Sequence, residues 1–263
     1  MGDTGRIAVP LESRAGHHRA RRQGRPADAA IEDYLKTIYQ HTEWQSDPIT
    51  PSVLASMLRI SPASVTGMVK KLAASGLVEH KPYGPLLLTA EGHSRAVAVV
   101  RRHRIVETWL VNEMGYSWDE VHDEAEVLEH SISDKLLIAI DDRLGNPEHD
   151  PHGDPIPTVQ GHTRRPNFTL LSNAHPDDEG TVLRISDRDP DLLRLLASHN
   201  MRPGAHVQVH QFSKTTIFIS INNSGKIIEL PGSGADIIWI TASDPGLLKR
   251  PGSAPSQTVD ELH

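Results

Sequence analysis

The sequence predicts a mainly α-helical fold with a smaller β portion, and three observations support this fold class. Helical spacing of apolar residues runs through most of residues 28–144. A short hairpin pattern at about residues 77–92 interrupts it after the third expected helix. Five short stretches rich in β-branched residues then crowd into residues 180–241, which is typical of a small β-barrel.

The first part of the chain follows the element order of a winged helix-turn-helix. An amphipathic helix is expected over residues 28–44. Shorter helices should start at Thr50-Pro51 and at Ser61-Pro62, because a hydroxyl can cap a helix and Pro is tolerated in its first turn. Two short strands around a Lys-Pro-Tyr-Gly-Pro turn come next. This order predicts a DNA-binding winged helix-turn-helix over residues 27–95.

A helical domain and a barrel should follow. Helices are expected from about Ala90 to Met114 and from near Ser117, where Glu120 completes a capping-box pattern. The predicted boundaries place the helical domain at 96–157, a linker at 158–174 and the barrel at 175–242, with one short helix at 189–200. Residues 1–26, which are basic, and residues 243–263 are expected to be disordered tails.

Length and composition exclude several classes of protein. The 263 residues are enough for two or three small domains. No apolar run reaches the length of a membrane span, and the first residues have no secretory pattern, so we expect a cytoplasmic protein without a membrane partner. The chain has no cysteine, which excludes disulfides, iron–sulfur clusters and thiolate metal sites.

The charge distribution favours a nucleic-acid partner for the first part of the chain. Residues 1–105 carry 15 Lys/Arg against 9 Asp/Glu, whereas the remainder carries 12 against 25. The second helix of a helix-turn-helix enters the major groove, so its first residues are candidates for base contacts and nearby lysines for phosphate contacts. These candidates are Ser61, Ala63, Ser64, Thr66 and Gly67 for bases, and Lys70, Lys71 and Lys81 for phosphates. A protein-contact module with the same helices remains an alternative.

The helical region gathers imidazole and carboxylate side chains at helical spacing. The pairs four residues apart are His103 with Glu107, His122 with Glu126, and Glu126 with His130; Glu129 adds a further donor. Nitrogen and oxygen donors without sulfur suit Mn, Fe or Zn. The residues alone leave open a metal sensor, a carboxylate-type metalloenzyme and a metal-independent module with a charged surface. The HExxH pattern of zinc proteases is absent, and no catalytic residue is expected.

The helix-turn-helix, the run RRHRIVETWLVNEMGYSWDEVHDEAEVLEHSISD and the later HGDPIP together resemble the diphtheria toxin repressor family of bacterial metal-dependent repressors. The resemblance covers residues 28–157 and resumes at about 177–241. It implies a winged-helix domain, a helical dimerisation domain and a C-terminal SH3-like barrel. It also implies a homodimer on double-stranded operator DNA, with no enzymatic activity and no small-molecule substrate.

The family resemblance further implies two metal ions per subunit. The primary site would use Asp33, Glu126, Glu129 and His130, the ancillary site His103, Glu107 and His122, and the barrel would lend Asp189 and Asp191.

The expected metal is Mn(II). Iron-responsive members carry Met and Cys where this chain has the oxygen donors Asp33 and Glu126, and oxygen donors suit Mn(II). Fe(II), Co(II) and Zn(II) are expected surrogates, and an iron-dependent repressor of the same family is the alternative. The chain departs from short manganese regulators, which have Glu at the place of Lys36. It departs from iron-type members, which have Gln at the place of Gly67.

Overall fold

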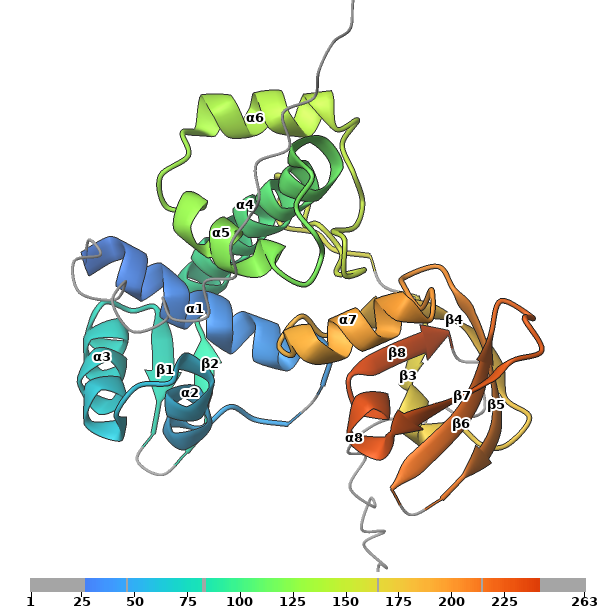
Figure 1. The fold of residues 1–263 in the computed structure, drawn as a ribbon. Coiled ribbons are helices and arrows are strands. Elements are labelled where there is room, and N and C mark those ends of the chain that lie inside the picture. Colours follow the sequence, from blue (N-terminus) through green and yellow to red (C-terminus); the bar gives the residue numbers. More distant parts are fainter. Residues whose placement is uncertain (1–26, 46, 82–83, 165, 214, 242–263) are drawn as a thin grey trace, which may run out of the picture.

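The computed structural model describes residues 27–45, 47–81, 84–164, 166–213 and 215–241. Both predicted tails lie outside these ranges. The described chain forms three parts (Figure 1): a winged helix-turn-helix, a helical middle and a β-barrel. The predicted fold class, with an SH3-like barrel at its C-terminal end, is confirmed.

The winged helix-turn-helix closes around one apolar core. Thr50 and Ser61 cap two of its helices by accepting the N–H groups of Val53 and Ser64, as the sequence predicts. The core joins residues of all its elements, with Leu35, Leu54 and Leu72 fully enclosed. The elements are α1 (Ala27–Glu43), α2 (Pro51–Leu58), α3 (Pro62–Ala74), β1 (Val78–His80) and β2 (Leu86–Leu88).

The helical middle consists of α4 (Ala90–Met114), α5 (Val121–Leu128) and α6 (Asp134–Arg143). The helical stretch predicted from Ser117 therefore starts later and is divided in two. The Ser117 N–H does donate to Glu120 Oε1 at 3.0 Å, but the helix begins only at Val121. Ser133 divides the stretch because its extended backbone and its hydroxyl cap a new helix, α6.

The barrel is a six-stranded antiparallel sheet with the order β3-β8-β4-β5-β6-β7. The five predicted strands and the short helix are present. A sixth strand, β3, pairs with β8 and starts at Phe168, so the sheet extends into the segment predicted as a linker. The elements are β3 (Phe168–Leu170), a 3-10 turn (Leu171–Asn173), β4 (Glu179–Ile185), α7 (Pro190–Ser198), β5 (His206–Phe212), β6 (Thr216–Ile221), β7 (Ile227–Pro231), α8 (Gly232–Ala235) and β8 (Ile238–Thr241).

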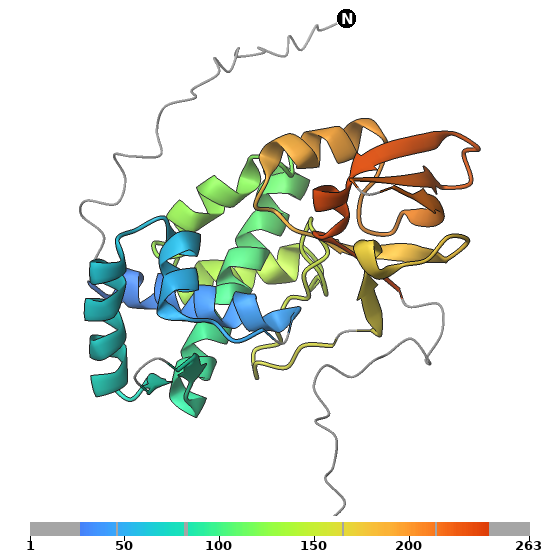
Figure 2. The same cartoon turned by 90° about the horizontal axis from the view of Figure 1, so that it is seen from below.

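Trp118 and Asp154 are among the residues that attach the barrel to the helices. Trp118, just before α5, packs in the barrel core. The carboxylate of Asp154 accepts from Trp44 Nε1 and from Arg184 Nε, both at 2.6 Å, and so connects the end of α1 with β4. In both views the barrel and α3 lie on opposite sides of the molecule (Figures 1 and 2). The barrel thus leaves the helix-turn-helix face uncovered.

Among the described residues, no single helix is long and apolar enough to cross a membrane. The pair α2 and α3, bent by 115°, meets the same length and composition criterion only when taken together.

Candidate metal centre

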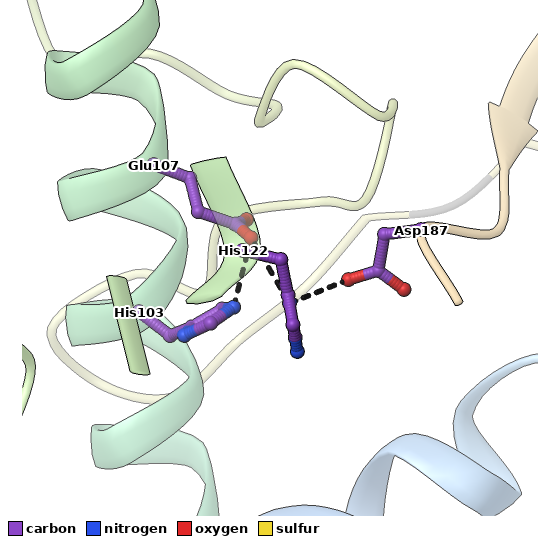
Figure 3. A group of neighbouring side chains, drawn as sticks. All are labelled: His103, Glu107, His122 and Asp187. Carbon is purple, nitrogen blue, oxygen red and sulfur yellow. Dashed lines mark hydrogen bonds and ion pairs between the residues drawn. The ribbon is translucent and has the colours of Figure 1, made fainter. Parts of the chain in front are cut away.

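Four side chains meet between α4, α5 and the segment after β4. Figure 3 shows His103 and Glu107 on α4 facing His122 and Asp187. One ligand atom from each lies within 4.8 Å of the others. His103 Nε2 is 2.9 Å from Glu107 Oε1, and His122 Nδ1 is 2.9 Å from Asp187 Oδ2. The three residues predicted for an ancillary site are therefore brought together, with Asp187 as a fourth.

Paired charges shift the pKa values in this group. Burial alone would lower the pKa of His103, but Glu107 and Glu129 raise it to about 9. Burial likewise opposes the charged form of His122, whose pKa Asp187 and Glu107 nevertheless raise well above the ordinary value. Burial would raise the pKa of Asp187, but His122 holds it well below its usual range. The group thus consists of carboxylates held ionised by protonated imidazoles.

The predicted barrel ligands Asp189 and Asp191 do not join this group. Asp189 caps α7 by accepting the N–H of Leu192 at 3.1 Å. Asp191 is exposed and pairs with Arg194. Asp187, two residues before Asp189, is the barrel carboxylate that reaches His122. A carboxylate ligand from this segment was predicted, but at Asp189 or Asp191 rather than at Asp187.

A second group lies where α1 meets the end of α5. Ligand atoms of Asp33, Glu129 and His130 lie within 4.8 Å of one another. His130 Nε2 is 2.8 Å from Asp33 Oδ1 and 3.2 Å from Glu129 Oε1, while its Nδ1 is 2.8 Å from Glu32 Oε2. Burial opposes the charged imidazole, yet Asp33, Glu129 and Glu32 raise the pKa of His130 to about 11.

Glu126, the fourth residue predicted for the primary site, groups with Glu129 and His103 rather than with Asp33. The Lys36 ammonium lies between the two glutamates: Nζ is 2.7 Å from Glu129 Oε1 and also contacts Glu126 Oε1. Burial would lower the pKa of Lys36, but Glu129 and Glu126 raise it above its ordinary value. His103 Nδ1 reaches Glu129 Oε2 at 2.5 Å, which joins the two groups.

A third set of buried donors consists of Glu107 and two residues in or just before the HGDPIP segment. Glu107, Asp150 and His152 also bring ligand atoms within 4.8 Å of one another. Burial, then the charges of Asp154 and Glu107, raise the pKa of Asp150 to about 7. His152 Nε2 donates to the Trp118 carbonyl at 2.7 Å, while its buried Nδ1 has no hydrogen-bond partner. The sequence analysis did not predict Asp150 and His152 as ligands, although His152 opens the HGDPIP motif and stands among carboxylates.

The donor set fits a divalent cation. The buried nitrogens His103 Nε2 and His152 Nδ1 have no hydrogen bond of good geometry, although carboxylates lie 2.9 and 3.9 Å away. Buried polar atoms are normally satisfied. Imidazole and carboxylate groups gathered in this way, with buried imidazole nitrogens that lack a hydrogen-bond partner, are the kinds of ligand that Mn, Fe or Zn accept once the imidazoles lose their protons.

The predicted DNA-contact residues are all exposed. None is covered by another element. Thr66 donates to the Pro62 carbonyl at 2.9 Å, and a Cβ at Gly67 would meet no atom within 4 Å, so the helix surface there is open. The exposed residues are Ser61, Ala63, Ser64, Thr66, Gly67, Lys70 and Lys71 on α3 and its cap, and Lys81 after β1.

Comparison with known proteins matches all three parts of the chain to families. Residues 28–86 match the N-terminal DNA-binding domain of iron-dependent repressors, and residues 89–158 match their metal-binding and dimerisation domain. Residues 169–242 match the FeoA domain. The diphtheria toxin repressor of Corynebacterium jeikeium is 33% identical over 220 residues, which cover 82% of this chain and 86% of that protein. The chain belongs to the diphtheria toxin repressor family.

Solved structures of metal-dependent repressors share the fold of this family member. A manganese-dependent transcriptional repressor in complex with manganese is 42% identical, with a TM-score of 0.77, and the match covers 81% of this chain and 99% of that one. The repressor ScaR with bound Zn²⁺ is 30% identical with a TM-score of 0.69, over 80% and 98% of the two chains. The predicted family, and with it the prediction of a metal-dependent transcriptional repressor, is confirmed.

Proposed function

We propose that this protein is a manganese-activated repressor that binds operator DNA as a homodimer. The contact between the DNA-binding domain and the metal-binding domain carries the proposal. Asp33 belongs to α1, the first helix of the DNA-binding domain, whereas His130 and Glu129 follow α5. The 2.8 Å approach of His130 to Asp33 joins ligands from both domains in one group.

Two divalent ions per subunit suit the arrangement of donors. Asp33, Glu129 and His130 would hold the first ion, with Glu126, which groups with Glu129 but not with Asp33, as its fourth ligand. His103, Glu107, His122 and Asp187 would hold the second. A divalent cation bound there would neutralise the gathered carboxylates, and Asp33 would then tie α1 to the dimerisation domain. The chain's own residues then fix the angle at which α3 is presented. A dimer reads half-sites roughly 34 Å apart, so a small angular error loses contacts.

Manganese is the metal that the donors favour. The chain has no cysteine, and the gathered groups contain only imidazole nitrogen and carboxylate oxygen. Oxygen-rich sites suit Mn(II), whereas sulfur donors favour softer ions. The structural neighbours described as manganese-dependent repressors support the same choice. An iron-dependent repressor is the alternative that metal titrations test.

Asp33→Ala tests the proposed coupling. The variant should remain a folded dimer but lose the gain in DNA affinity on adding Mn(II), typically about 5- to 150-fold for coupled sites, because α1 no longer supplies a ligand. Fluorescence anisotropy with a labelled promoter fragment measures this gain. Asp28→Ala, at an exposed position on the same helix, is the matched control. An Asp33→Ala protein with the full manganese response contradicts the proposal.

A further inference from the structure

Lys36 is enclosed by the metal centre although it carries a positive charge. It lies on α1 three residues after Asp33, and it is 3% exposed. Its ammonium contacts Glu129, which is fully buried, and Glu126, which is 29% exposed. Lysine is almost never fully buried unless it is paired. The position of Lys36 therefore depends on these two carboxylates.

The same carboxylates belong to the groups that could hold a cation. Glu129 is shared by both groups at this end of the centre, one with Asp33 and His130 and the other with His103 and Glu126. The Lys36 ammonium thus contacts Glu129, the carboxylate that belongs to both groups. Like charges repel strongly where water is largely excluded. A divalent ion on these oxygens and the Lys36 ammonium cannot both keep full contact with them.

We propose that Lys36 is a tethered cation that competes with the activating divalent ion for Glu126 and Glu129 and so sets the metal concentration at which the protein responds. The inference rests on the proposed function, because it concerns the same centre. In the metal-free protein the ammonium neutralises Glu129 and Glu126 and holds α1 against the end of α5. Metal binding must move it away, which weakens the apparent affinity for the ion.

Lys36→Met removes the charge but keeps an unbranched side chain. The variant should bind Mn(II) about tenfold or more tightly, because the competing cation is gone. Its metal-free form should melt at a lower temperature, because the buried carboxylate of Glu129 and the half-buried one of Glu126 lose their partner. Lys36→Arg keeps the charge and should stay near wild type in affinity. Lys135→Met, at an exposed position on α6, is the control. Competition with a fluorescent chelator measures affinity, and melting in EDTA measures stability.

A purely structural role for Lys36 predicts the opposite affinity change. If Lys36 merely supported the fold, the Met variant would lose stability and metal affinity together. Unchanged or weaker Mn(II) binding in a folded Lys36→Met protein therefore overturns the proposal.

A measurement on the wild-type chain does not depend on the Met variant folding. With ¹⁵N-labelled lysine, a buried, hydrogen-bonded ammonium should give a slowly exchanging signal in chelator-treated protein, assigned by its absence in Lys36→Arg. Adding Zn(II), a diamagnetic probe, should shift or remove that signal. A Lys36 signal that stays unmoved at saturating Zn(II) overturns the proposal.

These readouts involve no DNA, so they separate this inference from the proposed function. Displacement of Lys36 by a metal that has no effect on DNA affinity supports the inference and contradicts the proposed function. A full gain in DNA affinity on adding Mn(II), together with a Lys36 signal that stays unmoved, contradicts the inference and supports the proposed function. A wild-type protein with no affinity for divalent metal overturns both.

Discussion

Each imidazole of the metal centre faces carboxylates on more than one side. His103 lies between Glu107 and Glu129, with nitrogen–oxygen distances of 2.9 and 2.5 Å. His130 lies between Asp33 and Glu32, both at 2.8 Å. Such pairs hold the imidazoles protonated in the metal-free protein, because opposite charges favour the charged form of both partners. The ligands are therefore gathered before metal arrives, but they carry protons that metal must displace.

Metal binding should release protons and should strengthen as the pH rises. The pKa values of His103 and His130 are raised to about 9 and about 11, so both are charged near neutral pH, whereas a metal ligand must be neutral imidazole. Raising the pH toward these values removes the competing proton and increases Mn(II) affinity. Titration calorimetry in two buffers of different ionisation enthalpy measures the release. Equal apparent enthalpies in both buffers would contradict this prediction.

Glu126→Cys should change the preference among metals. A thiolate in place of this carboxylate adds a soft donor, which favours Fe(II) or Zn(II) over Mn(II). Calorimetric titration of the variant with each metal gives the ranking, and Glu120→Cys, at an exposed position before α5, controls for an added thiol. If the ranking equals that of the wild type, the donor argument for manganese is wrong.

At the scale of elements, helix periodicity explains which parts of the site are predictable. Four-residue spacing places His103 and Glu107 on one face of α4 whatever the rest of the fold does. The approach of β4's end to α5 is tertiary, so no local pattern indicates that Asp187 reaches His122. Asp189 instead caps α7, a role that its position directly before Pro190 could have indicated. The enclosed position of Lys36 was equally hidden, since a lysine on an amphipathic helix is normally solvated.

The two aspartates provide a matched pair of variants. Of the two ions proposed per subunit, Asp187→Ala should lose the one held with His103, Glu107 and His122, because it removes a carboxylate 2.9 Å from His122. Asp189→Ala should keep both ions and lose about 1 kcal/mol of stability through the missing helix cap. Native mass spectrometry counts the ions, and thermal melting reports the cap. Loss of an ion from Asp189→Ala but not from Asp187→Ala would contradict the assignment.

At the scale of the whole molecule, the order of the three parts follows from the sequence, but their joints do not. Trp118 packs in the barrel core although it precedes α5, and Asp154 ties Trp44 to Arg184 across three parts of the chain. Such contacts join residues far apart in sequence, which no local periodicity encodes. In the proposed function they matter because they help to place Asp187 and Asp33 against the same helical domain.

The proposed function depends on one coupling, between metal binding at the candidate centre and DNA binding by α3. The most direct measurement is the affinity of the wild-type protein for a labelled promoter fragment, by fluorescence anisotropy, after EDTA stripping and again after adding Mn(II). The account predicts weak binding without metal and about 5- to 150-fold tighter binding with it. Equal affinity for the promoter in the stripped and the manganese-loaded protein would contradict it.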